Sequence, residues 1–409
     1  MSRKWVEKEG LLWVEKNIVT REQYTQILDL YNDKKHAIGV LPLLGSILVG
    51  LGILSFVAAN WQEIPQMARL LMIIVLMVAC YGGGELFRKS GNDRLGLAMT
   101  TLGLISFGGG IVLIAQMFHL VSYDIMSFIV WGSVGTLLTY LYRSKFLYLI
   151  SLLIFTCAQW YSTIEHDGFS YVGFIIMAVG LGYYGWKNQH MLLAWFFSLS
   201  IVLQSLILVL DREWKFLWIF IPLMALYAVG DWIKDRSSGF ALQSVPLAAA
   251  FLFAIVMVLM FDDFTDGDRY ELLAEPLYFI FSMLVILAAS LFGKWTNGRI
   301  SSGFEWVLLV PVIYLQSSIA VMYLVILFFF SFYVLWSGYM EQWRFKINFG
   351  TLLFIVTTMV AYGKLTWAFM DKSLFFILGG LILLGLSWFL NHRKKLVLSD
   401  MKKEEEPHD

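Results

Sequence analysis

Long apolar runs separated by short charged segments recur along the whole of this 409-residue chain. A helix needs about 20 apolar residues to cross the roughly 30 Å hydrocarbon core of a bilayer, where each backbone polar group must be satisfied within the protein. Only 15% of the residues are charged, against 59% hydrophobic, so a soluble surface could not be covered. The pattern predicts an all-α, polytopic transmembrane helical bundle and excludes a soluble enzyme, a disordered chain and a disulfide scaffold.

The runs give about fourteen predicted spans, each near the length of a membrane-crossing helix. They are residues 38–59, 66–87, 95–118, 125–142, 146–162, 169–186, 191–210, 216–233, 240–261, 277–293, 305–318, 320–340, 346–362 and 373–390. Residues 305–340 could also form one long helix, but Gln316, Ser317 and Ser318 interrupt them. We predict two helices joined by a short turn, because one helix would place basic residues at opposite faces of the membrane.

The distribution of Lys and Arg gives an independent test of this span count. With the amino terminus inside, 24 of the 30 Lys and Arg residues fall in inner segments and five fall in outer loops. Such an asymmetry is typical of cytoplasmic loops, and a wrong number of spans would disturb it from the error onward. The charges therefore predict that both termini are cytoplasmic.

The chain divides into three predicted parts. Residues 1–37 form a cytoplasmic helical hairpin, with helices at 3–16 and 21–33 and a capping box in which Gln23 follows Thr20 by three residues. Residues 38–390 form the transmembrane domain, and residues 391–409 form a charged cytoplasmic tail. A net charge of zero and the lack of a basic recognition face argue against nucleic acid as a partner. The predicted partners are the lipid bilayer and a protein bound through residues 1–37.

Several polar residues gather at the predicted outer ends of the first six spans. Gln116 and His119 lie three apart and therefore share one helical face. Other polar residues near the same ends are Gln159, Glu165 and Asp167. Because polar side chains in membrane spans are costly, these residues indicate a candidate polar cavity, although solvated loop positions would give the same pattern. The candidate cavity residues are Asn60, Gln62, Gln116, His119, Asp124 and His166.

The sequence contains no ligand spacing that is typical of a metal or cofactor site. No HExxH pair occurs, and the acidic stretch 262–276 fails as a calcium loop because Phe264 and Leu273 occupy ligand positions. We predict no catalytic residue, no metal and no cofactor.

Other residues inside the spans have structural interpretations. Gln204, Gln243 and Gln316 are expected to form hydrogen bonds between helices, while Lys364 and Asp231 are expected to snorkel to the interface. The glycines at 108–110 predict close helix packing, with a locally unwound helix lining a cavity as the alternative.

Three stretches carry a family resemblance. They are KWVEKEGLLWVEKNIVTREQYTQILDLY at the amino terminus, LGILSFVAANWQEIPQMARL with GGGIVLIAQMFHL, and the tail that begins RFKINFGTLLFIVTTMVAYG. Together they resemble domain of unknown function 2157, whose defining first part covers roughly residues 3–145. The resemblance implies a multi-pass protein of the bacterial inner (plasma) membrane. It implies no activity and transfers no catalytic residue.

Three functional hypotheses follow from these observations. The first is a conduit or carrier with an outer-facing polar cavity. The second is a non-enzymatic membrane scaffold or sensor that engages a partner through residues 1–37. The third is an intramembrane enzyme for a lipid-linked substrate, which would use His119, Glu165, His166 or Asp167.

Overall fold

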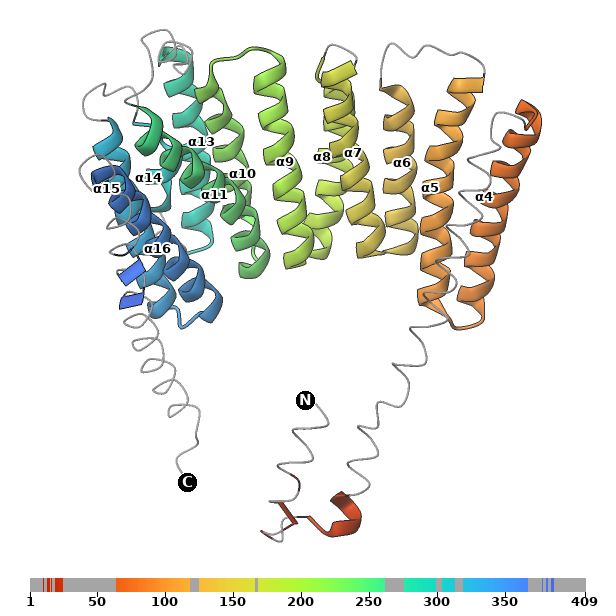
Figure 1. Cartoon of the computed structure of the whole chain (residues 1–409), viewed down its shortest axis with the longest axis horizontal. Helices are drawn as coiled ribbons and strands as arrows, with labels where there is room; N and C mark the ends of the chain where they lie inside the picture. The colour runs from red at the N-terminus through yellow and green to blue at the C-terminus, as the bar shows by residue number, and fades with distance from the viewer. Residues whose placement is uncertain are drawn as a thin grey trace. The chain divides into compact units, whose positions relative to one another are not determined.

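The structure, a computed structural model, describes residues 64–117, 125–165, 168–261, 276–298, 304–312 and 319–366, with further positions between 10 and 24 and between 377 and 385. These residues form helices and turns, and no strand occurs among them (Figure 1). The chain divides into two compact units, Met1–Val75 and Leu76–Asp409, with the boundary inside α4. The all-α prediction is confirmed.

The helices follow one another with short connections. They are α4 (Gln66–Lys89), α5 (Asp93–Met117), α6 (Met126–Tyr142), α7 (Lys145–Glu165), α8 (Tyr171–Asn188), α9 (Met191–Asp211), η2 (Phe216–Ile219), α10 (Phe220–Trp232), α11 (Arg236–Met260), α13 (Pro276–Thr296), α14 (Trp306–Leu309), α15 (Ile319–Met340) and α16 (Arg344–Thr366).

In the first unit, the predicted capping box is confirmed. The Thr20 N–H donates to Gln23 Oε1 at 2.9 Å, and the Gln23 N–H donates to Thr20 Oγ1 at 3.3 Å. The two bonds satisfy backbone donors that a helix start would otherwise leave free. Gly10 is helical and buried, and a Cβ there would overlap the Tyr24 ring. The two predicted helices therefore touch, while the partner of residues 1–37 stays a prediction.

Short turns in the second unit make consecutive helices antiparallel. Residues Arg143 and Gln189 end α6 and α8 in the left-handed region, with φ of 48° and 37°. Asp235 caps α11 by accepting from the Ser238 N–H at 2.8 Å. The turns that follow α4, α6, α8, α10 and α15 lie at one end of the helices, drawn lowest in Figure 1. We call this end the basic side, because Lys and Arg flank each of these turns.

The helices of the second unit pack in a regular order. α5 packs on α6, α6 on α7, α7 on α9 and α9 on α11, while α8 covers α6, α7 and α9. α10 packs on both α11 and α13, and α15 packs on both α11 and α16. The largest apolar core lies among α9, α10, α11, α13 and α15, and includes the fully buried Met224 and Leu327. α10 and α11 are therefore central to this half of the unit.

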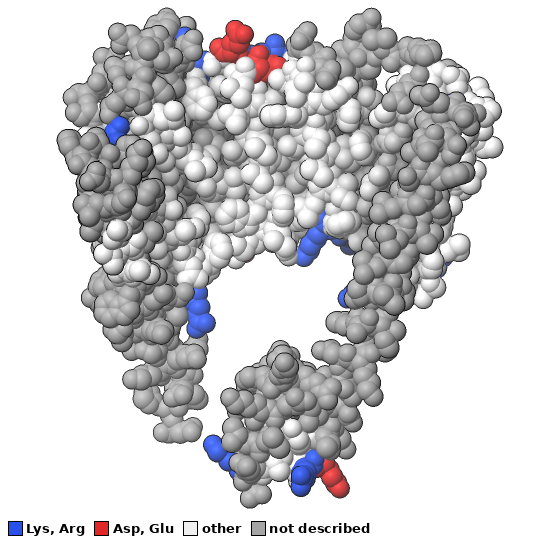
Figure 2. Space-filling model, in the orientation of Figure 1, with Lys and Arg blue, Asp and Glu red and all other residues white. Residues whose placement is uncertain are grey.

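The outer surface of these helices is apolar. Leu153, Val179, Phe281 and Phe329 are each more than 60% exposed. Figure 2 shows a band of uncharged side chains between the two ends of the helices, with Lys and Arg at the lower edge and residues of both charges at the upper edge. A surface of this kind is stable only in lipid, since water would be in contact with a large apolar area. The chain is a membrane protein, as predicted.

Eight of the described helices are long and apolar enough to cross a membrane, and 126–142 and 216–232 are shorter apolar helices. Each predicted span from 66–87 to 277–293 coincides with one helix or with the η2–α10 pair. The count of about fourteen is not confirmed, because the predicted spans 38–59 and 373–390 lie wholly or largely outside the described residues.

The predicted helix at 305–318 is wrong in its described part. α14 covers only Trp306–Leu309, and Val310 is extended with φ −94° and ψ 106°. The cause is Pro311, whose ring disfavours the helical conformation of the preceding residue. Residues 313–318 lie outside the described residues.

The glycines at 108–110 lie inside a continuous helix, so the locally unwound alternative is wrong and close packing is confirmed. A Cβ at Gly108 would overlap the Trp131 ring, whose Nε1–H donates to the Leu104 carbonyl at 2.9 Å. Gly108 therefore allows α6 to approach α5. Nothing lies within 4 Å of the Cβ position at Gly109.

These two glycines form a matched pair for a test. Gly108→Ala should lower the free energy of unfolding by about 1–2 kcal/mol, because overpacking against Trp131 exceeds the helix-propensity gain of about 1 kcal/mol. Gly109→Ala should be neutral or stabilising by up to ~1 kcal/mol. Unfolding of both variants in mixed micelles, followed by tryptophan fluorescence, measures the difference. Equal effects would show that Gly108 has no packing role.

Candidate functional site

The predicted polar cavity lies almost wholly outside the described residues. Asn60, Gln62, His119, Asp124 and His166 are not among them. Gln116 lies in the last turn of α5, but its side chain is not described. The outer-facing cavity therefore stays a prediction, and the described helices contain a different polar centre.

That centre is a buried ion pair between α10 and α13. Lys294 Nζ lies 2.9 Å from Asp231 Oδ1, and both residues have an exposed fraction of 0%. Moving either charge from water into a low-dielectric interior costs several kcal/mol, so one charge without the other would not remain ionised there. The pair can be buried only because the two helices bring opposite charges together.

Further hydrogen bonds satisfy the Asp231 carboxylate. Gln243 of α11 donates from Nε2 to Oδ1 at 2.6 Å, and the Ser290 hydroxyl of α13 donates to Oδ2. The Asn297 side chain donates to the Asp231 backbone carbonyl at 2.6 Å. Ser290 and Lys294 are four residues apart and so share the face of α13 that contacts α10. Asp231 thus links three helices.

Lys294 is held from its other side by aromatic residues. Its Nζ donates to the Tyr227 hydroxyl at 2.9 Å and lies 4.8 Å from the centre of the Tyr227 ring. The Trp306 ring centre is 5.8 Å away, and the Trp306 indole N–H donates to Ser290 Oγ at 3.1 Å. Rings near an ammonium group stabilise its charge through their π electrons, most strongly where water is absent. Lys294 is therefore enclosed by the Asp231 carboxylate on one side and by the Tyr227 and Trp306 rings on the other.

The ion pair continues to the protein surface through further charged groups. The Tyr227 hydroxyl donates to Glu305 Oε2 at 2.7 Å, and Glu305 Oε1 lies 3.9 Å from Lys346 Nζ. Lys346 Nζ lies 3.3 Å from Glu341 Oε1, and Glu341 Oε2 lies 2.5 Å from Arg236 Nη2. The Arg236 side chain is 59% exposed. We call Asp231, Lys294, Tyr227, Glu305, Lys346, Glu341 and Arg236 the charge network.

The charge network has no net charge, since it contains three carboxylates and three basic groups. It lies on the basic side, because Asp231 is at the end of α10, Arg236 begins the first turn of α11, and Lys346 is in the first turn of α16. The Arg236 and Glu341 side chains are 59% and 33% exposed, whereas Lys346 and Glu305 are buried and Lys294 is 0% exposed. The network is a continuous polar connection from solvent to a fully buried ion pair.

The sequence identified only part of this site. The prediction that Asp231 snorkels to the interface is wrong, because Lys294 neutralises it in the interior. The expected interhelical hydrogen bond of Gln243 is confirmed, and Gln204 of α9 donates to Met177 Sδ of α8 at 2.9 Å. Lys294 directly follows the predicted span 277–293 and is one of the 24 basic residues that the charge pattern assigns to inner segments. Its helical spacing of four from Ser290 was the available signal that it lies on a polar helix face.

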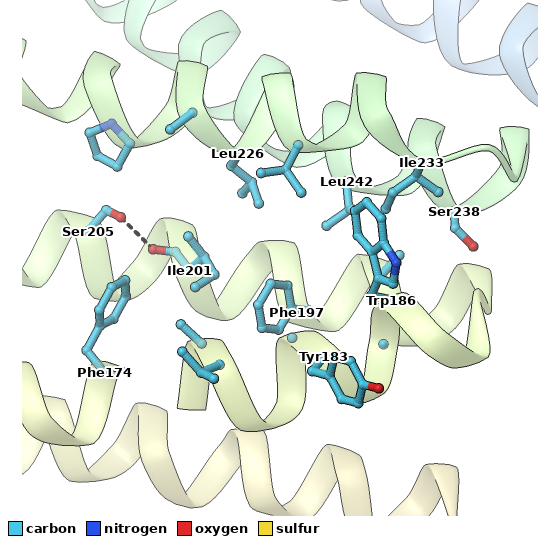
Figure 3. A pocket seen from close by; sticks show the side chains of 18 of the residues that line it. Phe174, Tyr183, Trp186, Phe197, Ile201, Ser205, Leu226, Ile233, Ser238 and Leu242 are labelled. Atoms are coloured by element: carbon cyan, nitrogen blue, oxygen red, sulfur yellow. Dashed lines mark hydrogen bonds between the residues drawn. The ribbon is translucent and has the colours of Figure 1, made fainter. Parts of the chain in front are cut away.

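A separate apolar groove lies beside the charge network. It has a volume of about 670 Å³ and is bounded mainly by α8, α9, α10 and α11. In Figure 3 it runs along α9, from Ser205 and Phe174 at one end to Trp186 and Ser238 at the other. Val179 and Val229 on its rims are 66% and 44% exposed, so the groove is open to the surroundings of the helices.

The groove and the charge network share two helices. Leu226, Val229 and Ile233 line the groove, at helical spacings of three and four along α10. Tyr227 and Asp231 lie on a different face of the same helix and belong to the network. A shift of α10 would therefore affect both sites.

Comparison with known proteins finds a family match for the first third of the chain. Residues 11–148 match the family model described as Predicted membrane protein (DUF2157). We call residues 11–148 the DUF2157 region, because over these residues the chain is similar to that family. This confirms the resemblance found in the amino-terminal sequence. The DUF2157 region includes α4, α5, α6 and the first turn of α7, while the charge network lies beyond it. No curated protein and no solved structure matches the chain.

The ion pair predicts a stability pattern. Lys294→Met and Asp231→Asn should each destabilise the protein by about 3–5 kcal/mol, because each leaves a buried charge uncompensated. The double variant should cost clearly less than the sum of the two. Denaturant titration of detergent-solubilised protein measures all three.

The exposed pair of Lys89 and Glu85, 4.0 Å apart, provides the control. Lys89→Met should change the free energy of unfolding by no more than about 0.5 kcal/mol. If the Lys294 and Asp231 effects are strictly additive, the two charges are not coupled and the interpretation of the site is wrong.

Proposed function

We propose that this membrane protein is a carrier, and not an enzyme, that takes up and releases protons at the charge network. One observation supports this proposal most directly: a fully buried Lys294–Asp231 pair is joined to the exposed Arg236 by a continuous series of polar contacts. Ionisable residues within membrane helices are costly, and they commonly mark proton or substrate pathways.

The proposal also includes the orientation of the protein in the membrane. The excess of basic residues at the turns on the basic side favours a cytoplasmic location for that side. Both termini would then be cytoplasmic, in the inner membrane of a bacterium. Protons would reach the network from the cytoplasm, past Glu341 and Lys346.

The chemistry of the network suits proton movement. Asp231, Glu305 and Glu341 can each accept a proton as carboxylates, and the Tyr227 hydroxyl can both donate and accept. In the proposed cycle, a proton from water reaches Glu305 and Lys294 passes one of its own protons to Asp231. The Tyr227 hydroxyl, between Glu305 and Lys294, then gives its proton to Lys294 and takes the one held by Glu305. Protonation of Asp231 would remove its negative charge and with it the charge attraction that holds Lys294.

Loss of this attraction gives a physical route to conformational change. α13 is attached to α10 through the Asp231–Lys294 pair, the Ser290 bond and the Asn297 bond. A neutral Asp231 would leave the Lys294 charge unpaired, which costs several kcal/mol in the interior. The state in which α13 has moved away from α10, or in which Lys294 has lost its proton, would then be favoured.

The test is proton flux into proteoliposomes that contain a trapped pH-sensitive dye. With an inside-negative potassium diffusion potential, the wild-type protein should acidify the interior faster than protein-free vesicles. Asp231→Asn should reduce the rate to that of protein-free vesicles, because an amide cannot accept the proton. Tyr227→Phe should do the same while preserving the packing of the ring.

Glu85→Gln provides the control, since it makes the same carboxyl-to-amide change on the side chain that pairs with Lys89 at an exposed position. Its flux should equal that of the wild type. Wild-type flux no faster than that of empty vesicles would contradict the proposal, and so would unchanged flux in both network variants.

A further inference from the structure

The groove between α8 and α10 combines an apolar length with a polar end. Its middle is formed by side chains such as Phe197, Ile201 and Leu226 (Figure 3). From Ala194 to Ser205 it follows α9 over 11 residue-to-residue steps, which is about 16 Å at 1.5 Å per residue. This is close to half of the roughly 30 Å hydrocarbon core, the depth of one leaflet.

Two hydroxyl groups that line the groove have no partner. Tyr148 Oη and Ser238 Oγ form no hydrogen bond within the described part of the chain, and their residues are 0% and 2% exposed. A buried hydroxyl without a partner costs about 1–3 kcal/mol, so such groups normally indicate a missing acceptor or donor. Polar atoms of a ligand at this end of the groove would supply the missing partners.

Both hydroxyls lie near the basic side. Tyr148 is in the first turn of α7, and Ser238 is in the first turn of α11, whose preceding turn belongs to the basic side. A Cβ on Gly185, close to the end of α8, would lie 3.3 Å from the Tyr148 hydroxyl. The polar end of the groove is therefore at the membrane interface, and its apolar end points toward the membrane interior.

Basic residues flank the polar end. Lys187 directly follows Trp186, and Lys234 directly follows Ile233, where Trp186 and Ile233 both line the groove. The nearby Asp235 carboxylate caps α11 through the Ser238 N–H. Lys187 and Lys234 are exposed, so they can meet a negatively charged group at the interface.

We propose that this groove binds one acyl chain of an anionic phospholipid from the leaflet on the basic side. The chain lies along α9 and reaches the region of Phe174 and Ser205. An ester carbonyl of the lipid accepts hydrogen bonds from Tyr148 and Ser238, and Lys187 and Lys234 attract its phosphate. This proposal does not depend on proton movement, because the groove and the charge network use different faces of α10.

Lipid occupancy explains both the apolar and the polar features. Without an occupant, the apolar walls would lose dispersion contacts along the length of the groove. Phospholipid chains are present at high concentration around any membrane protein, and the open rim at Val179 and Val229 admits them laterally. A zwitterionic lipid would fill the apolar part equally well but would gain less from Lys187 and Lys234.

The experiment uses the full chain in nanodiscs that contain a photoactivatable phospholipid with a diazirine near the end of one acyl chain. Phosphatidylglycerol and phosphatidylcholine probes with identical chains are compared, and adducts are mapped by peptide mass spectrometry. The proposal expects adducts on residues that line the apolar end, such as Phe174 and Ser205, with several-fold more from the phosphatidylglycerol probe.

Two variants test the groove itself. Ala225→Phe fills it from α10 and should abolish these adducts, whereas Ala289→Phe makes the same change at an exposed position of α13 and should not alter them. The Tyr148→Phe and Ser238→Ala double variant removes only two oxygen atoms, and should reduce phosphatidylglycerol labelling by about tenfold through the loss of two hydrogen bonds.

Three results would overturn the proposal. They are equal labelling by both lipids, labelling that Ala225→Phe leaves unchanged, and the absence of adducts on the residues that line the apolar end of the groove. Each variant is also compared with the wild type by thermal unfolding, and only folded variants are scored. Because proton flux is not read in this experiment, its outcome is independent of the proposed carrier function.

Discussion

A carboxylate and an ammonium group can be buried in a membrane protein only together, and the Asp231–Lys294 pair sets this constraint for the carboxyl-terminal half of the chain. To bury the pair, α10 and α13 must be adjacent and in a fixed register. Gln243 adds α11 to the arrangement, and Tyr227 connects the pair to Glu305, just before α14. Lys346 then brings in α16. Five helices are thus positioned by polar contacts within surroundings that are otherwise apolar.

The position of α10, which the ion pair fixes, relates the charge network to the apolar groove. α10 is only 13 residues long, yet one face carries Tyr227 and Asp231, and another carries Leu226 and Val229. Buried ion pairs contribute little net stability compared with apolar packing, so their presence is better explained by specificity or switching than by strength. If α13 leaves α10 when Asp231 is protonated, the groove wall formed by α10 is free to move as well. A bound acyl chain would then act on the same element as the proton.

Much of the fold could be predicted from the sequence, because lipid imposes a simple rule on apolar runs. The predicted spans from 66–87 to 277–293 all correspond to helices, since length and hydropathy alone determine them. The exception in this half of the chain, 305–318, failed where Pro311 forced Val310 out of the helix. This break was predictable, because proline disfavours a helical conformation of the residue that precedes it. The capping box at Thr20 and Gln23 was also predictable, because it depends on residues three positions apart.

The site was much less predictable, because it depends on contacts between residues far apart in sequence. Asp231 and Lys294 are separated by 63 residues, and each alone resembles a residue at the end of a span. The charge pattern therefore assigns Lys294 to a loop, although its side chain is buried inside the protein. The groove and the unpartnered hydroxyls of Tyr148 and Ser238 could not be predicted either. A hydroxyl is recognised as unpartnered only when the surrounding helices are known, and no sequence periodicity indicates it. The predicted outer cavity at Gln116 and His119 stays a prediction.

The central claim is that the helices alternate across the membrane, with the turns around the charge network on one side. Its most direct test is labelling of single cysteines with a membrane-impermeant maleimide in intact and permeabilised cells, after Cys80 and Cys157 are replaced by serine. Cysteines introduced by Gly91→Cys, Gln189→Cys and Gln342→Cys, in turns of the basic side, should all react only after permeabilisation. Glu213→Cys, in the turn after α9, should react in intact cells. Labelling of any of the first three from the outside, or of Glu213→Cys only from the inside, would contradict the account.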